Sequence, residues 1–190
     1  MTTGSVSARR ADTRRNHERI LVAAAESLTG SDEVSFNAIA KEAGVGVGTV
    51  YRHFPTPAAL ILAVYQREVR HLVEVVPSLL DRHAPEEAFR IWIFDYLVHY
   101  MMTKRGLVKA LAAATACQGE LPAEAYEAMK DAMSSLLKAN VEAGTVREGL
   151  DPETLLSGLY GLFHLDPRGD WRSRTERLLD LLWRGMSVGR

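Results

Sequence analysis

Apolar residues recur every three or four positions along most of this 190-residue chain, which is the spacing of one face of an α-helix. Strict alternation of apolar and polar residues, the mark of a half-buried strand, is missing from the sequence. The pattern therefore predicts an all-α fold of about nine helices. They are expected over residues 14–29, 36–43, 47–53, 57–77, 85–102, 105–116, 122–144, 152–164 and 172–186, with loops at 77–84, 144–151 and 165–171.

The short helices expected at 36–43 and 47–53 have the spacing of a helix-turn-helix. Ala40 is small enough for two helices to cross closely, and Gly44 can take the left-handed conformation that ends a helix in a sharp turn. Val45 then fills the turn, and Val50 faces inward from the second helix. Such a motif places its second helix in the major groove of DNA.

Polar and amphipathic side chains surround Val50 on that second helix. Thr49 can contact a phosphate or a thymine methyl group, and Tyr51 and His53 suit phosphate oxygens. Arg52 can read a guanine edge or hold a phosphate instead. Phe54 is expected in the core, and Tyr51 half-buried with its hydroxyl group outward.

Charge supports a nucleic-acid partner through its distribution. The net charge is −1, but five of the residues from 9 to 19 are arginine and only two are acidic. Arg14 and Arg15 can therefore reach phosphates from the first helix. For residues 1–12, an arm that contacts DNA and a solvated, disordered tail are both open.

The segment GVGVGTVYRHFPTPAAL, with RILVAAAESL at Arg19–Leu28 before it, resembles the DNA-binding region of the TetR family of bacterial transcriptional regulators. This resemblance covers residues 14–66. Many relatives have a lysine or another long polar residue at the position of Val47, and a lysine at that of Pro57, so we expect more reliance on methyl contacts and DNA shape here. The expected DNA contacts are Arg14, Arg15, Ser35, Asn37, Gly46, Val47, Gly48, Thr49, Tyr51, Arg52 and His53.

The resemblance implies two domains. Residues 1–57 would form the helix-turn-helix domain with its basic N-terminal arm, and residues 58–190 a helical domain for ligand binding and dimerisation. It further implies a repressor that binds a near-palindromic double-stranded DNA operator as a homodimer and is released by a small-molecule effector. An activator with the same architecture stays open.

Residues 88–102 are apolar around nearly the whole helix circumference, which indicates a centrally buried helix. Asp95 and His99 lie four apart within it, so they either satisfy one another or meet a ligand. The candidate effector contacts, whose alternative role is plain core packing, suit a mainly apolar or aromatic molecule. They are Trp92, Asp95, Tyr96, His99, Met102, Cys117, Tyr126, Met129, Met133 and Phe163.

The last two predicted helices carry leucine stripes with small residues between them. Such faces allow close approach of another helix, and the resemblance implies a four-helix dimer interface here. Packing within the chain is the alternative role of these residues. The candidate contacts are Leu155, Gly158, Leu159, Leu162, Leu178, Leu182 and Met186.

Several classes of protein are disfavoured. Cys117 is the single cysteine, which excludes an intramolecular disulfide and a zinc-finger spacing, and no metal or other cofactor is expected. The first 20 residues are polar, and the apolar runs are far shorter than the roughly 20 residues of a membrane span, so we expect a cytoplasmic protein without a membrane partner. Two alternatives to the regulator are an architectural DNA-binding protein of low specificity and an all-helical enzyme using Cys117 or His99. No nucleophile–base spacing favours the enzyme.

Overall fold

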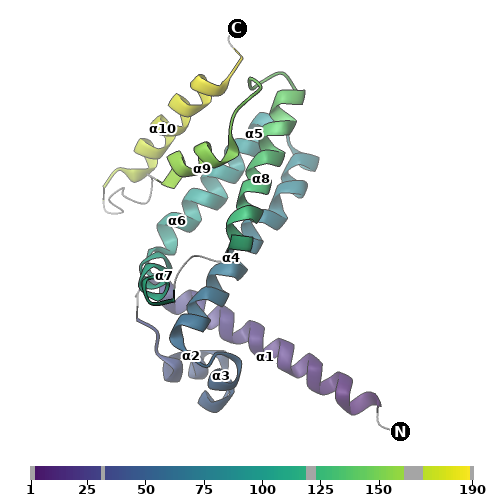
Figure 1. The fold of residues 1–190 in the computed structure, drawn as a ribbon, viewed down its shortest axis with the longest axis vertical. Coiled ribbons are helices and arrows are strands. Elements are labelled where there is room, and N and C mark those ends of the chain that lie inside the picture. Colours follow the sequence, from purple (N-terminus) through teal and green to yellow (C-terminus); the bar gives the residue numbers. More distant parts are fainter. Residues whose placement is uncertain (1–2, 31–32, 119–122, 161–168, 189–190) are drawn as a thin grey trace. The chain divides into compact units, whose positions relative to one another are not determined.

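The computed structural model describes residues 3–30, 33–118, 123–160 and 169–188. These residues are almost entirely helical (Figure 1), and the predicted all-α class is confirmed. Within these ranges the β-structure is limited to an isolated antiparallel bridge between Val146 and Ser187. The helices are α1 (Thr3–Gly30), α2 (Phe36–Ala43), α3 (Val47–His53), α4 (Pro57–Arg82), α5 (Pro85–Ile91), the π-helix η1 (Trp92–Val98), α6 (His99–Thr103), α7 (Arg105–Gln118), α8 (Ala123–Glu142), α9 (Pro152–Tyr160) and α10 (Trp171–Met186).

The chain packs as two compact units, and the boundary between them falls inside α4. The first unit comprises Met1–Glu68 and Lys104–Pro122, and the second comprises Val69–Thr103 and Ala123–Arg190. These units are defined by which residues pack together. The predicted boundary after residue 57 separates a DNA-binding part from the rest by function, and it stays a prediction.

In the first unit, α1 is longer than the sequence pattern indicated. It begins at Thr3 rather than near residue 14, so the disordered tail considered for residues 1–12 is wrong from Thr3 onward. Alanine and arginine between residues 8 and 15 favour helix formation and extend α1 toward its N-terminus. Ile20, Ala24 and Leu28, which lie one turn apart along α1, are fully buried and form its inner stripe.

The helix-turn-helix itself forms as predicted. The Ser35 hydroxyl accepts a hydrogen bond from the Ala38 N–H group at 3.4 Å and caps α2. Gly44 ends α2 with φ 60° and ψ 42°, the left-handed conformation that favours glycine. Ala40 is buried where the helices meet, and Val50 is fully buried on the inner face of α3.

Helix α7, which falls within the second domain that the resemblance implied, packs against α1 in the first unit. The Lys104 ammonium group, just before α7, donates to the Ala25 carbonyl oxygen at 3.2 Å, near the C-terminal end of α1. A cation is favourable there because the carbonyl ends of a helix carry partial negative charge.

In the second unit, the predicted helix over 85–102 contains a π-helix. Helices α5, η1 and α6 follow one another without a break, and η1 occupies the middle of the run. The Trp92 indole is fully buried, and its N–H group donates to the Leu72 carbonyl oxygen at 2.8 Å. Asp95 and His99 are exposed, so the predicted burial of this polar pair is wrong. One side of η1 faces solvent although its sequence is mostly apolar.

Helix α4 continues past Pro77 to Arg82, whereas the sequence pattern predicted its end at the proline. Pro77 is exposed. The carbonyl group that a proline leaves without an intrahelical partner costs least on a solvated face of a helix, so the helix can pass through it.

Buried Asn140 joins α8 to α5. Its amide group donates to the carbonyl oxygens of Pro85 and Leu136, both at 2.9 Å, and its side-chain oxygen accepts from the Thr145 hydroxyl at 2.8 Å. The polar groups of this buried side chain are thereby satisfied, as burial requires. The segment after α8 is held to the end of α10 by the Arg147 N–H group, which donates to the Met186 carbonyl oxygen at 2.9 Å.

Candidate functional site

The recognition helix of the motif, α3, has one buried side and one bare side. Val50 is fully buried, while Val47 is 39% exposed and Tyr51 is 55% exposed. A Cβ atom built on Gly46 or Gly48 would meet no described atom within 4 Å. The exposed side therefore consists of uncovered backbone at the glycines, the two methyl groups of Val47 and the phenol ring of Tyr51. A binding partner can approach this backbone closely.

Two buried aromatic side chains support α3: Phe36 contacts Tyr51, and Phe54 lies at the C-terminal end of the helix. The Tyr51 ring lies 4.8 Å from the buried Phe36 ring, at 60° to it. Tyr51 is thus anchored at one edge although it is more exposed than predicted. Phe54 is 4% exposed, which confirms its predicted place in the core.

His17, which the sequence pattern had not singled out, lies beside the C-terminal end of α3. Its ring is 4.9 Å from the Phe54 ring and 5.5 Å from the His53 ring. Burial, and then the nearby His17 and Arg52 charges, lower the pKa of His53 below its ordinary value. The spacing could have revealed His17, because it lies three residues before Ile20 and continues the inner stripe of α1.

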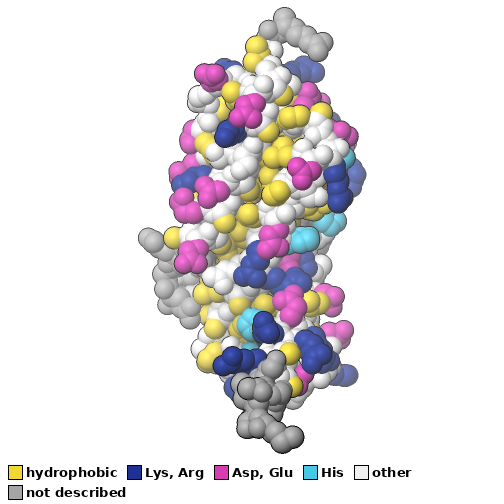
Figure 2. Space-filling view, turned by 90° about the vertical axis from the view of Figure 1, so that its right-hand side faces the viewer, with side chains coloured by type: hydrophobic (Ala, Val, Ile, Leu, Met, Phe, Trp, Pro, Cys, Tyr) yellow, Lys and Arg dark blue, Asp and Glu magenta, His cyan; other side chains and the backbone are white. Residues whose placement is uncertain are grey.

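The predicted cationic contacts are exposed. Arg14, Arg15 and Arg52 all reach solvent. Arg15 is paired with Asp12 on the same helix, and the Arg19 guanidinium donates to the Gly44 carbonyl oxygen at 3.4 Å. Figure 2 shows several Lys and Arg side chains around the lower end of the view, over the unit that contains α2 and α3. This surface suits a polyanion.

The remaining predicted DNA contacts lie on the same motif. Ser35, Asn37, Gly46 and Gly48 are exposed, and Thr49 and His53 are half-buried. The Ser35 hydroxyl already caps α2, so its hydrogen-bonding capacity for DNA is partly used.

The candidate effector residues differ in burial and are divided between the two units. Trp92, Met129 and Met133 are buried, Tyr96, Met102 and Tyr126 are half-buried, and Asp95 and His99 are exposed. Phe163 and the Cys117 side chain lie outside what the structure describes, and α7, which contains Cys117, belongs to the first unit. Their role in binding an effector stays a prediction.

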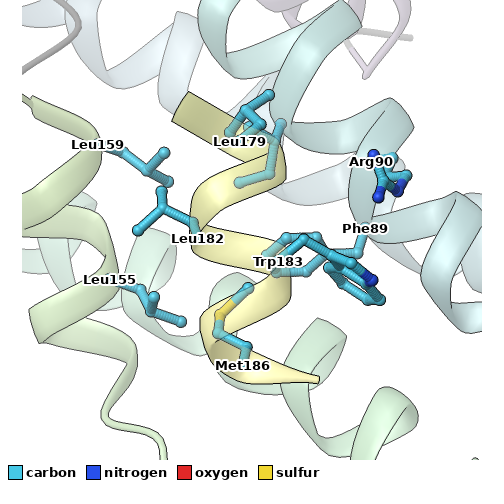
Figure 3. Close-up of a pocket in the computed structure, with 9 residues that line it drawn as sticks. Phe89, Arg90, Leu155, Leu159, Leu179, Leu182, Trp183 and Met186 are labelled. Carbon is cyan, nitrogen blue, oxygen red and sulfur yellow. The ribbon is translucent and has the colours of Figure 1, made fainter. Parts of the chain in front are cut away.

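A cavity in the second unit is lined by none of these candidates. It has a volume of about 360 Å³, counting space open to solvent, and lies between α5 with the start of η1, α9 and α10. Figure 3 shows Trp183 of α10 beside Phe89 and Arg90 of α5, with Leu182 pointing toward Leu155 and Leu159 of α9. The lining residues are Phe89, Arg90, Ile93, Leu155, Leu159, Leu179, Leu182, Trp183 and Met186.

Four candidate dimer contacts line this cavity within the single chain. They are Leu155, Leu159, Leu182 and Met186. Gly158 is exposed, Leu178 is half-buried, and Leu162 lies outside the described residues. The alternative role considered for these leucines, packing within the chain, therefore applies to part of the set, and their role in a dimer stays a prediction.

None of the helices in the described part combines the length and the apolar character that crossing a membrane requires. Among the same residues, no three His, Cys, Asp or Glu side chains are grouped so that they could hold a metal ion.

Comparison with known proteins gives matches over both units. Residues 20–64 match the family described as bacterial regulatory proteins, tetR family, and residues 84–188 match the C-terminal domain of SbtR-like transcriptional regulators. HTH-type transcriptional regulators of Staphylococcus aureus are 31% identical over 107 residues, which is 55% of this chain. The match covers 57% of the length of those relatives.

Solved structures resemble the chain over nearly its full length. A TetR transcriptional regulator from Streptomyces coelicolor is 35% identical with a TM-score of 0.76, over 92% of this chain and 99% of that one. A TetR regulatory protein from Mycobacterium vanbaalenii is 33% identical with a TM-score of 0.72, over 94% and 99% of the two chains. The Thermus thermophilus repressor FadR, solved with lauroyl-CoA, is 27% identical with a TM-score of 0.61, over 92% and 96%.

Proposed function

The chain belongs to the TetR family of bacterial transcriptional regulators, which bind DNA, and from this premise we propose that it is an effector-responsive repressor of transcription. In this proposal it binds a near-palindromic operator as a homodimer in the cytoplasm. Membership of this family favours a regulator over an enzyme.

The observation that carries the proposal is the exposed side of α3. Val50 is fully buried, whereas Val47 and Tyr51 are exposed and Gly48, next to Tyr51 around the helix, leaves the backbone uncovered. A helix in the major groove reads base edges with the few side chains that reach them. Here these are Val47, which suits a thymine methyl group, and Arg52, which suits a guanine edge or a phosphate.

A homodimer is proposed because α9 and α10 keep exposed small and apolar residues. Gly158 on α9 is exposed, and Leu181 on α10 is 67% exposed. A two-fold axis through such a face presents two recognition helices to half-sites about one helical turn apart, which explains why the operator should be near-palindromic.

Release by an effector is the remaining part of the proposal. The related FadR was solved in complex with lauroyl-CoA, a molecule with a long apolar chain. By analogy with this relative, we propose an apolar or aromatic effector for this chain. Helix α4 contributes residues to both compact units, so a change at its C-terminal part is linked covalently to the motif. A coupling of about 1–3 kcal/mol would change operator affinity roughly 5- to 150-fold.

Selection of bound duplexes from a random DNA library, read by sequencing, tests the proposal. We expect an enriched near-palindrome with the wild-type chain and a strong loss of enrichment with Arg52→Ala. Arg70→Ala is the matched control, because Arg70 is exposed on α4 in the second unit. DNA binding without any enriched sequence would contradict the repressor and favour the architectural protein instead.

A further inference from the structure

The N-terminal part of α1, residues 3–16, extends beyond the place where this helix joins the motif. The joint begins at His17, whose ring lies 4.9 Å from the Phe54 ring at the end of α3. The next residue, Glu18, accepts a hydrogen bond at 2.6 Å from the Arg67 guanidinium of α4. Figure 1 shows the N-terminal end of α1 projecting beyond α2 and α3. Residues 3–16 therefore form a helical extension of the first unit, called the α1 arm below.

The α1 arm is polar and basic. It contains four arginines and one acidic residue, Asp12. Between Ala8 and Arg15, the described side chains are exposed except that of Ala11, which is half-buried. An apolar face, which a helix needs to lie on a membrane, is missing from this stretch of sequence. A polyanion such as DNA is the partner that fits its charge.

The described arginines of the arm lie on two different sides of the helix. With about 100° per residue, Arg10 and Arg14 both lie within roughly 60° of His17 around α1. Arg15 lies roughly 160° from His17, where it is paired with Asp12. Among the described residues, no carboxylate is paired with Arg10 or Arg14. These two guanidinium groups are therefore available to an anion on the side of α1 that contacts the end of α3.

The spacing of Arg10 and Arg14 suits consecutive phosphates. They are four residues apart, which is about 6 Å along the helix, and like charges at this spacing repel one another. Duplex DNA carries one negative charge per about 1.7 Å of its axis, so several phosphates lie within that distance and can relieve the repulsion. The whole arm is about 21 Å long, which is the length of about six base pairs.

We propose that the α1 arm is a second DNA-binding element, which lies along the duplex outside the half-site read by α3, with Arg10 and Arg14 on its phosphates. This rests on the proposed operator binding, because the contact of His17 with α3 fixes where the arm begins. Phosphate contacts add affinity without reading bases, so the arm lengthens the bound site but not the recognised sequence. Arg15, which the sequence analysis expected on DNA, makes no contact in this arrangement.

Operator duplexes with and without flanking DNA test the arm. The palindrome selected from the random library is measured by fluorescence anisotropy, once with about six additional base pairs on each side and once without them. The wild-type chain should bind the longer duplex roughly tenfold more tightly, whatever the flanking sequence. The double variant Arg10→Ala/Arg14→Ala should bind both duplexes with the same affinity.

Two further variants show whether charge on the correct side of the helix is responsible. Arg15→Ala is the matched control, because it removes the same charge from the exposed surface of the same arm, and it should keep the wild-type preference for the longer duplex. Arg10→Lys/Arg14→Lys keeps both charges and should keep most of that preference. The proposal is overturned if the double alanine variant still prefers the longer duplex, or if Arg15→Ala loses the preference to the same extent.

Salt dependence distinguishes a failure of the arm from a failure of the proposed repressor. Each phosphate contact that is lost should reduce the slope of the logarithm of affinity against the logarithm of salt concentration by about 0.9. Phosphate contacts do not depend on sequence, so the slope can also be measured on a duplex of random sequence. A shallower slope for Arg10→Ala/Arg14→Ala without any selected palindrome would support the arm and contradict the repressor. A selected palindrome with equal slopes would overturn the arm alone.

Discussion

Replacement of Gly48 by alanine should make the protein more stable and its operator complex weaker. Gly48 lies inside α3, and its φ is outside the left-handed range, so alanine fits the backbone without strain. The added methyl group would meet no described atom within 4 Å. Alanine is favoured over glycine in a helix by about 0.5–1 kcal/mol, which corresponds to an increase in Tm of roughly 1–4 °C for a chain of this size.

The same methyl group lies on the side of α3 proposed to face DNA. With about 100° per residue, Gly48 lies roughly 160° around the helix from buried Val50 and between Tyr51 and Arg52. If the DNA approaches the bare backbone there, the methyl group must push it away. We expect at least a tenfold loss of operator affinity, which is about 1.4 kcal/mol.

Urea unfolding followed by circular dichroism and operator binding followed by fluorescence anisotropy measure the two effects on one preparation. Gly44→Ala is the matched control, because Gly44 has φ 60° and its new Cβ atom would collide with the Arg19 guanidinium. It should lose about 1–2 kcal/mol of stability. A Gly48→Ala protein that is less stable than wild type would refute the helix argument, and unchanged operator affinity would refute the close approach of DNA.

Three other substitutions test separate contacts. Trp92→Phe removes the hydrogen bond to the buried Leu72 carbonyl group and should lower the free energy of unfolding by about 1–3 kcal/mol in urea titrations, whereas an unchanged value would show that this bond contributes little. Ser35→Ala removes the cap of α2 and should cost about 0.5–2 kcal/mol by the same measurement, with Ser134→Ala at an exposed position of α8 as the control. Burial lowers the pKa of His53 below 6.5, so the folded state binds fewer protons than the unfolded state, and the stability that His53 contributes is complete above pH 6.5 and lost as the pH falls through the lower folded pKa. Urea titrations at several pH values should therefore show a smaller loss of stability on acidification for His53→Asn than for wild type, and equal losses would contradict this.

Local chemistry explains why the motif could be predicted. The cap at Ser35, the left-handed turn at Gly44 and the buried Val50 all depend on residues within about fifteen positions of one another. Turn and capping preferences act at that range, so the sequence alone determines them. The ends of α1 and α4 were less predictable, because a helix can extend through an arginine-rich segment or an exposed proline without a strong opposing signal.

No feature of the sequence that we considered predicted the π-helix η1. An α-helical period places residues four apart on one face, and this led to the prediction that Asp95 and His99 share a buried face. Residues four apart still lie close together around a π-helix, so the shared face forms, but the fold turns it to solvent rather than to the core. Both side chains are exposed instead.

The cavity could not be predicted for a different reason. Periodicity shows that a position on α10 is apolar, but it does not show which of two apolar neighbours covers it. Leu178 and Leu182 lie one turn apart and were assigned to the same dimer face, yet Leu182 lines the cavity and Leu178 does not. The separation depends on Phe89 and Arg90, which are about ninety residues away in sequence and meet α10 only in the folded unit. A cavity built from such contacts has to be located from the fold, because none of the described helices carries enough of it to form a motif.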